Sequence, residues 1–363
     1  MGGSRAEAAE GNHVPQSLRD LSDELQTRFP GARLAPRGYR FLGQAVRLVG
    51  NDAESAERVD AMVREFRTDA LPPDPAFTLY VLKDACAGAA TRYYTVDPGF
   101  NSFLCEDLSH LVSFWAAQLM RNHLYRAGYL LLHAAALDTG GKVCIFAGDA
   151  GCGKSTLVMR LAREGCGFFS DEVAPLDLAR GALHPFPRSL LLRPDWQALP
   201  GWETVPAPPR AAVLLDYQER LPDGTAPERW VVPPSDFGFR VERHPRGIDA
   251  IFFIAGRSPD GTRVASCEAP LALKMLLDHA MNSGYIGRDT PEAAVDGLES
   301  LLESVPAARV QLGPLTESPR VLRDALTRAA SDLRPSGLHD LRRVAEACRR
   351  RFGEQRAAGP EEP

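Results

Sequence analysis

The chain has 363 residues, of which 44% are hydrophobic and 25% are charged, a composition typical of a globular protein with a sizeable core and one or two domains. Its formal net charge of −5 argues against a nucleic-acid-binding protein, because such proteins usually carry a basic surplus or a basic face. Its seven cysteines are scattered and form no C-x-x-C pair, which fits neither a disulfide framework nor a zinc site.

The N-terminal part of the chain predicts a small α+β accessory region over residues 17–127. Residues 1–16 before it are small and polar, which is typical of a disordered terminus. Apolar residues then recur alternately at strand and helix spacing, which predicts several short elements of both kinds. The expected elements are helices over 17–29, 53–66 and 107–126 and strands over 41–49, 77–82 and 93–96.

Residues 128–335 predict a larger α/β domain, and residues 336–363 predict a charged helix with a disordered tail. Buried strands bounded by glycine alternate here with amphipathic helices. Residues 200–235 are rich in proline and glycine and predict one long loop. The expected elements are strands over 130–137, 143–147, 250–255 and 309–312 and helices over 155–164, 269–281, 291–302, 319–330 and 338–352.

The sequence indicates a cytoplasmic protein that binds no membrane. No N-terminal stretch has the charged, apolar and small-residue order of a signal peptide. The longest apolar run, near residues 129–137, is interrupted by His133 and is too short to span a bilayer. The scattered cysteines also fit reduced thiols in the cytosol.

A glycine-rich segment between a predicted strand and a predicted helix carries the strongest functional signal. Residues 148–155 read Gly-Asp-Ala-Gly-Cys-Gly-Lys-Ser and satisfy the P-loop pattern G-x-x-x-x-G-K-[ST] without a mismatch. Glycine lets the backbone wrap closely around phosphate oxygens, and the amides ahead of a helix form an anion-binding site. We therefore predict triphosphate binding by Gly148, Asp149, Ala150, Gly151, Cys152, Gly153, Lys154, Ser155 and Thr156.

Within this segment, Lys154 and Ser155 have distinct predicted roles. Lys154 would reach the β- and γ-phosphates, and the Ser155 hydroxyl would bind Mg²⁺. The chain has only four lysines and otherwise uses arginine, which cannot replace a compact ammonium in a tight phosphate site. The alternative is a glycine-rich strand-to-helix turn with an accidental lysine, which the complete pattern and its context disfavour.

Two acids follow the next short apolar segment. Asp171 and Glu172 come directly after the apolar pair at 168–169, whereas the later apolar strand at 251–254 ends without a carboxylate. A strand that returned beside residues 143–147 would end with both carboxylates facing the terminal phosphate. One acid could then bind Mg²⁺, and the other could accept a proton from an attacking hydroxyl. A surface turn or a helix start is the alternative interpretation.

The segment that contains the glycine-rich motif and the two acids resembles a known family. Residues 129–192 are similar to the catalytic core of HPr kinase/phosphorylase and related proteins. The segment that carries the resemblance reads LLHAAALDTGGKVCIFAGDAGCGKSTLVMRLAREGCGFFSDEVAPLD. The resemblance implies a P-loop kinase core of the HPr kinase/phosphoenolpyruvate carboxykinase type. It also implies that His133 and the second acid, Glu172, take part in catalysis, that Ser155 binds Mg²⁺, and that Asp171 is the first acid. By itself, a lone strand histidine such as His133 is usually structural.

The predicted function is an ATP-dependent, Mg²⁺-dependent kinase that phosphorylates a hydroxyl group. Lys154 and Mg²⁺ would neutralise charge on the transferred group, and Asp171 or Glu172 would take the hydroxyl proton. The acceptor would be a peptide serine or a small hydroxylated molecule. The predicted catalytic residues are His133, Lys154, Asp171 and Glu172, and the predicted metal ligands are Ser155 and Asp171.

Other interpretations remain open at the level of sequence. One is a nucleotide-binding regulatory or assembly module with little or no transferase activity, and another is phosphorolysis with pyrophosphate as product. A homo-oligomer is open as well, because relatives in the family are often oligomers. Arginines near the core could bind an acidic acceptor or lie on the surface, namely Arg188, Arg193, Arg240, Arg243 and Arg246.

Overall fold

The structure is a computed structural model, and the chain divides into two compact units. Unit 1 comprises Met1–His123, Arg188–Trp196 and Pro206–Pro233, and unit 2 comprises the remainder. The expected helix over 17–29 and most of the one over 107–126 lie outside the described residues. The described residues are 35–71, 73–84, 92–96, 103–105, 108–110, 128–203, 205, 212–215, 227–281 and 291–357.

A sheet with the strand order β3-β1-β2-β4-β5-β6 forms the larger part of unit 1. Its first two strands, β1 (Ala35–Phe41) and β2 (Gln44–Gly50), form a hairpin, where the sequence predicted a single strand over 41–49. The hydroxyl of Tyr39 donates to the buried carboxylate of Asp60 at 2.7 Å. The other elements are α2 (Ala53–Val63), η1 (Arg64–Phe66), β3 (Arg67–Thr68), β4 (Phe77–Asp84), β5 (Arg92–Val96), β6 (Phe103–Cys105) and α3 (Leu108–His110).

A three-stranded sheet in unit 1 corrects the prediction of one long loop over 200–235. Its strands are β12 (Leu190–Leu192), β14 (Glu228–Val232) and β13 (Ala212–Leu215), in that order. The side chains of Val231 and Val232 are fully buried. Burial of this short apolar run therefore outweighs the prolines around it, which mark turns but do not prevent strand pairing between them.

Unit 2 is built on a mixed nine-stranded sheet. The strand order is β15-β11-β10-β7-β8-β16-β18-β17, and β9 pairs with β7 as an additional neighbour. The central strands β8, β16 and β18 are parallel, whereas β7 is antiparallel to β8. The strands are β7 (Leu130–Asp138), β8 (Val143–Ala147), β9 (Gly167–Ser170), β10 (Val173–Asp177), β11 (Ala182–Leu183), β15 (Arg246–Gly247), β16 (Ala250–Arg257), β17 (Arg263–Cys267) and β18 (Ala307–Leu312).

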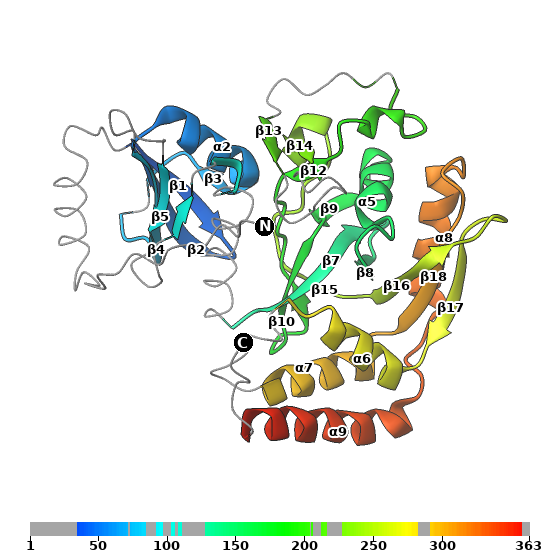
Figure 1. The fold of residues 1–363 in the computed structure, drawn as a ribbon. Helices are drawn as coiled ribbons and strands as arrows, with labels where there is room; N and C mark the ends of the chain where they lie inside the picture. Colours follow the sequence, from blue (N-terminus) through cyan, green and yellow to red (C-terminus); the bar gives the residue numbers. More distant parts are fainter. Residues whose placement is uncertain are drawn as a thin grey trace, which may run out of the picture. The chain divides into compact units, whose positions relative to one another are not determined.

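Helices cover both faces of this sheet (Figure 1). In β7, Leu132, Ala134 and Ala136 belong to one core cluster with residues of α6, α7 and α9. Because side chains alternate along a strand, His133 lies on the other face, which α5 and α8 cover. None of the described helices is long and apolar enough to cross a bilayer. The helices are α5 (Lys154–Arg163), α6 (Ala269–Asp278), α7 (Pro291–Ser304), α8 (Pro319–Asp332) and α9 (Leu338–Ala357), with short η3 (Trp196–Ala198) and η4 (Pro234–Phe237) elsewhere in the chain.

Candidate functional site

The glycine-rich loop, residues 148–153, connects β8 to α5 as the sequence predicts. Gly151 and Gly153 adopt φ angles of 77° and 107°, which a residue with a Cβ rarely adopts. At Gly148 the constraint is space, because an added Cβ would lie 2.8 Å from Cys152 Sγ and 3.2 Å from the carbonyl oxygen of Ile254. Each of the three glycines thus has a physical reason to be glycine.

The side chain of Lys154 folds back over the loop. Its Nζ donates to the carbonyl oxygens of Gly148 at 2.6 Å and Asp149 at 3.0 Å, and the residue is only 7% exposed. Among the residues that the structure describes, no carboxylate forms an ion pair with Lys154. Because a buried ammonium held only by neutral dipoles is poorly compensated, an anion in the loop would be strongly attracted.

The start of α5 adds to this attraction. Gly153 is the N-cap of the helix, and all ten residues from Lys154 to Arg163 are described, with no acidic side chain in the first turn. No acidic side chain within this turn therefore offsets the unpaired amides and the positive end of the helix dipole, which face the loop. Ser155 and Thr156 lie partly exposed in this first turn. The loop, the helix start and Lys154 together form a site with the electrostatics of an anion-binding site.

The sheet brings the two acids to the same edge as the glycine-rich loop. Both β8 and β9 are antiparallel to β7, so they run in the same direction and end at the same edge of the sheet, namely the edge formed by the ends of these strands. The amide of Ala134 donates to the carbonyl oxygen of Glu172 at 3.1 Å, and Ala134 also pairs with Ala147, the last residue of β8. Asp171 and Glu172 therefore lie level with the start of the loop.

One part of the predicted arrangement is wrong. The sequence analysis placed the strand before the acids directly beside β8, whereas β7 lies between β8 and β9. The backbones of Glu172 and Ala147 are therefore two strand spacings apart, about 10 Å. A phosphate bound in the loop, rather than direct contact between side chains, would span this gap.

A second histidine, which the sequence analysis did not identify, lies opposite His133. The amide of His133 donates to the carbonyl oxygen of His279 at 2.8 Å, and Leu132 forms a bridge with Ala280. The segment after α6 therefore pairs with β7 on the same side as β8, just beyond the last residue of β8. His279 consequently lies next to the glycine-rich loop, and both histidines flank the edge at which the acids lie.

The surroundings of His279 disfavour its charged form. Burial lowers the pKa of the His279 imidazole, and the charge of Lys154 lowers it further, while Asp149 and Asp278 act in the opposite direction. The influence of Lys154 and Asp149 follows from the position of His279 beside the loop. The imidazole is therefore held in its neutral form more strongly than in the unfolded chain.

This lowered pKa predicts a pH dependence of stability. The unfolded chain has an ordinary histidine pKa of about 6.5. As the pH falls below that value, the unfolded state binds the proton first, so the free energy of unfolding decreases until the pH passes the folded-state pKa. We expect His279→Gln to lose less stability than the wild type over this range in urea titrations. An unchanged or steeper loss of stability in the variant would contradict a lowered folded-state pKa of His279.

Two of the arginines considered for binding an acidic acceptor form ion pairs far from this edge. Arg240 and Arg246 contact Asp138 Oδ2 at 3.1 Å and 2.7 Å. Asp138 pairs with Val143, the first residue of β8, so it lies at the opposite end of that strand. A span of four residues in a strand is about 13 Å. These two arginines therefore stabilise the far edge of the sheet and are poorly placed to bind an acceptor.

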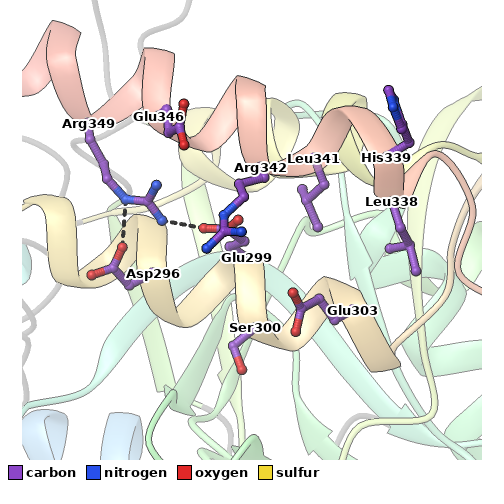
Figure 2. A pocket seen from close by; sticks show the side chains of 10 residues that line it. All are labelled: Asp296, Glu299, Ser300, Glu303, Leu338, His339, Leu341, Arg342, Glu346 and Arg349. Atoms are coloured by element: carbon purple, nitrogen blue, oxygen red, sulfur yellow. Dashed lines mark hydrogen bonds and ion pairs between the residues drawn. The ribbon is translucent and has the colours of Figure 1, made fainter.

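A cavity of about 770 Å³ lies between α7 and α9 (Figure 2). Its lining includes Arg349, which contacts Asp296 at 2.6 Å and also Glu299. No residue of the glycine-rich loop lines this cavity. Within the described part of the chain, no group of three or more His, Cys, Asp or Glu residues could hold a metal ion. The loop edge is therefore the better candidate site.

Comparisons with known proteins find a likeness to solved structures. No family model and no curated protein matches the chain. Among solved structures, the chain is similar to the Hpr(Ser) kinase/phosphatase from Coxiella burnetii, with 13% identity and a TM-score of 0.26. The match covers 55% of this chain and 95% of that chain. A likeness of this degree defines no family for the chain.

Proposed function

We propose that this chain is an ATP-dependent kinase that transfers the γ-phosphoryl group to a hydroxyl. The observation that carries the proposal is the ammonium of Lys154, which is buried over a glycine-rich loop and, among the described residues, is held by two backbone carbonyls and a neutral thiol rather than by a carboxylate. A triphosphate would replace these carbonyls as the partner of Lys154 and would accept hydrogen bonds from the amides at the start of α5.

The types of donor near the loop fit Mg²⁺. In nucleotide sites this ion commonly takes one or two protein oxygens, with water and phosphate oxygens completing the octahedron. Ser155 and Asp171 supply a hydroxyl and a carboxylate, and both are partly exposed. No cluster of three protein ligands is required for such a site. The ion would supply neutralisation of negative charge on the phosphate oxygens.

Transfer needs a proton acceptor beside the terminal phosphate. Asp171 or Glu172 serves this role in our proposal, because both follow β9 at the edge where the loop begins. His133 supports the acid through its position in β7, next to Ala134. This small set suffices because phosphoryl transfer depends mainly on positioning and charge stabilisation. A peptide serine or a small hydroxylated molecule is the acceptor.

The test is incubation of the full chain with γ-labelled ATP, Mg²⁺ and candidate hydroxyl acceptors. We expect label to appear on an acceptor together with stoichiometric ADP, and mass analysis to find one added phosphate. Binding of ATP without transfer to any hydroxyl would contradict the kinase and favour a nucleotide-binding regulatory module. Release of pyrophosphate in a reaction that requires inorganic phosphate would instead indicate phosphorolysis.

A further inference from the structure

Solvent reaches the central sheet of unit 2 at one residue of β7. Every residue from Leu130 to Asp138 is buried except His133, which is partly exposed. This strand lies inside the sheet, with β8 on one side and β10 and β9 on the other. A partly exposed side chain at such an interior position means that solvent, and therefore a ligand, can approach the face of the sheet there.

His279 lies directly beside this position. Leu132 forms an antiparallel bridge with Ala280, and the amide of His133 donates to the carbonyl oxygen of His279 at 2.8 Å. His133 and His279 are therefore the next opposed pair, and opposed side chains lie on the same face of a sheet with Cβ atoms about 5 Å apart. His279 is itself partly exposed. The histidine pair thus lies on the face of the sheet that α5 covers.

The histidine pair lies between the glycine-rich loop and the acids. His279 lies beside β7 just beyond the last residue of β8, where the loop begins. On the other side of β7, the amide of Ala134, next to His133, donates to the carbonyl oxygen of Glu172. The order across the sheet is therefore the loop with His279, then His133, then the acids. In our proposed function the terminal phosphate spans from the loop to the acids, so it lies over the histidine pair, with His279 on the side of the nucleotide.

The imidazole of His279 is available to a ligand. Within the described part of the chain, its ring forms no hydrogen bond and no ion pair. Burial and then the charge of Lys154 lower the pKa of this imidazole, so at neutral pH the ring carries one N–H donor and one acceptor nitrogen. The charges of Lys154 and Asp149 act on the ring because the loop lies beside it. A phosphate held by Lys154 would therefore lie next to this donor.

We propose that His279 is a catalytic residue, whose N–H donates a hydrogen bond to the phosphoryl group while it is transferred. The inference rests on the proposed function, in which ATP binds on the loop. In the reaction the bond from the γ-phosphorus to the oxygen of ADP breaks, and the bond to the acceptor oxygen forms. The acceptor proton passes to Asp171 or Glu172, and His279 keeps its own proton throughout. A donor placed where charge develops stabilises the transition state more than it stabilises bound ATP.

Substitution of the side chain tests this role without loss of the local pairing, because the hydrogen bond between His133 and His279 joins backbone atoms. His279→Ala and His279→Phe both lack the donor, whereas His279→Asn keeps one in its amide. The matched control is His184→Ala. His184 is a partly exposed histidine beyond β10 whose pKa is also lowered by burial, and its ring lies 5.0 Å from that of Tyr129.

Two quantities are compared for the full chain and its variants. One is the rate of ADP formation from saturating MgATP, with water or candidate hydroxyl compounds as acceptor, and the other is the dissociation constant of MgATP. We expect His279→Ala and His279→Phe to lower the rate by about 10²-fold. MgATP should bind each variant within about threefold of the wild type, because the loop and Lys154 hold the nucleotide. His279→Asn should retain more of the rate, and His184→Ala should match the wild type in both quantities.

Circular dichroism and urea unfolding establish that the variants are folded. A wild-type rate in either folded variant without the donor would overturn the role of His279 and leave the proposed function intact. A loss of MgATP affinity with an undiminished rate at saturation would overturn it as well, since the ring would then bind nucleotide without acting on transfer. If the wild type binds MgATP but forms no ADP, the proposed function fails, and the role of His279 fails with it.

Discussion

Replacement of Lys154 by alanine is expected to reduce phosphoryl transfer by about 10³-fold or more. The variant removes the side-chain cation that donates to the carbonyl oxygens of Gly148 and Asp149 in the glycine-rich loop. Charge that develops on the transferred group would then lack its main protein partner. Initial rates with γ-labelled ATP and saturating Mg²⁺ measure the effect, and equilibrium dialysis measures the accompanying loss of nucleotide affinity.

Two companion variants make this prediction specific. Lys274→Ala removes an exposed lysine from α6 and should keep the wild-type rate. Lys154→Arg keeps the charge but should remain impaired, because a planar guanidinium does not fit where a compact ammonium is buried. Thermal unfolding followed by circular dichroism verifies that each variant is folded. A folded Lys154→Ala protein with an undiminished rate would falsify the assigned role of this residue.

Neutralisation of the acid pair is the second large expected effect. A general base typically contributes 10²–10⁴-fold, so we expect the double variant Asp171→Asn/Glu172→Gln to lose about that factor or more in rate. Nucleotide affinity should change much less, because the loop and Lys154 would still hold the phosphates. Rates and dissociation constants are measured on the same preparations, so that a loss of transfer is separated from a loss of binding.

The single variants distinguish the two acids. If Asp171 binds Mg²⁺, Asp171→Asn should raise the Mg²⁺ concentration needed for half-maximal rate. The acid that acts as base should, when replaced, remove the acidic limb of the pH–rate profile. Asp177→Asn is the matched control, because Asp177 lies at the far end of β10 and pairs with Arg180. Full turnover by the double variant would rule out both acids as the base.

The local part of the candidate site was predictable from the sequence. Strand β8 has the predicted bounds, and α5 begins one residue before the predicted start. The reason is that the glycine, lysine and serine residues of this segment determine the backbone conformation of the segment itself and the start of the helix that follows. Dihedral preference and helix capping are short-range effects, so they can be inferred without knowledge of the remaining chain.

The contribution of distant segments was not predictable in the same way. His279 reaches the loop edge because Leu132 pairs with Ala280. No local sequence pattern predicts pairing between residues so far apart in the chain. The position of β9 beyond β7 has the same cause. Strand β17 was missed because Arg263, Ala265 and Ser266 are exposed, so its residues form no apolar run. These arrangements are decided by tertiary pairing rather than by propensity.

The most direct measurement is a crystal structure of the chain with Mg²⁺ and a non-hydrolysable ATP analogue. We expect Lys154 Nζ to leave the carbonyl oxygens of Gly148 and Asp149 and to contact phosphate oxygens. The terminal phosphate should lie between Ser155 and the carboxylates that follow β9. An analogue bound elsewhere, with both carbonyl hydrogen bonds of Lys154 intact, would contradict the proposed site.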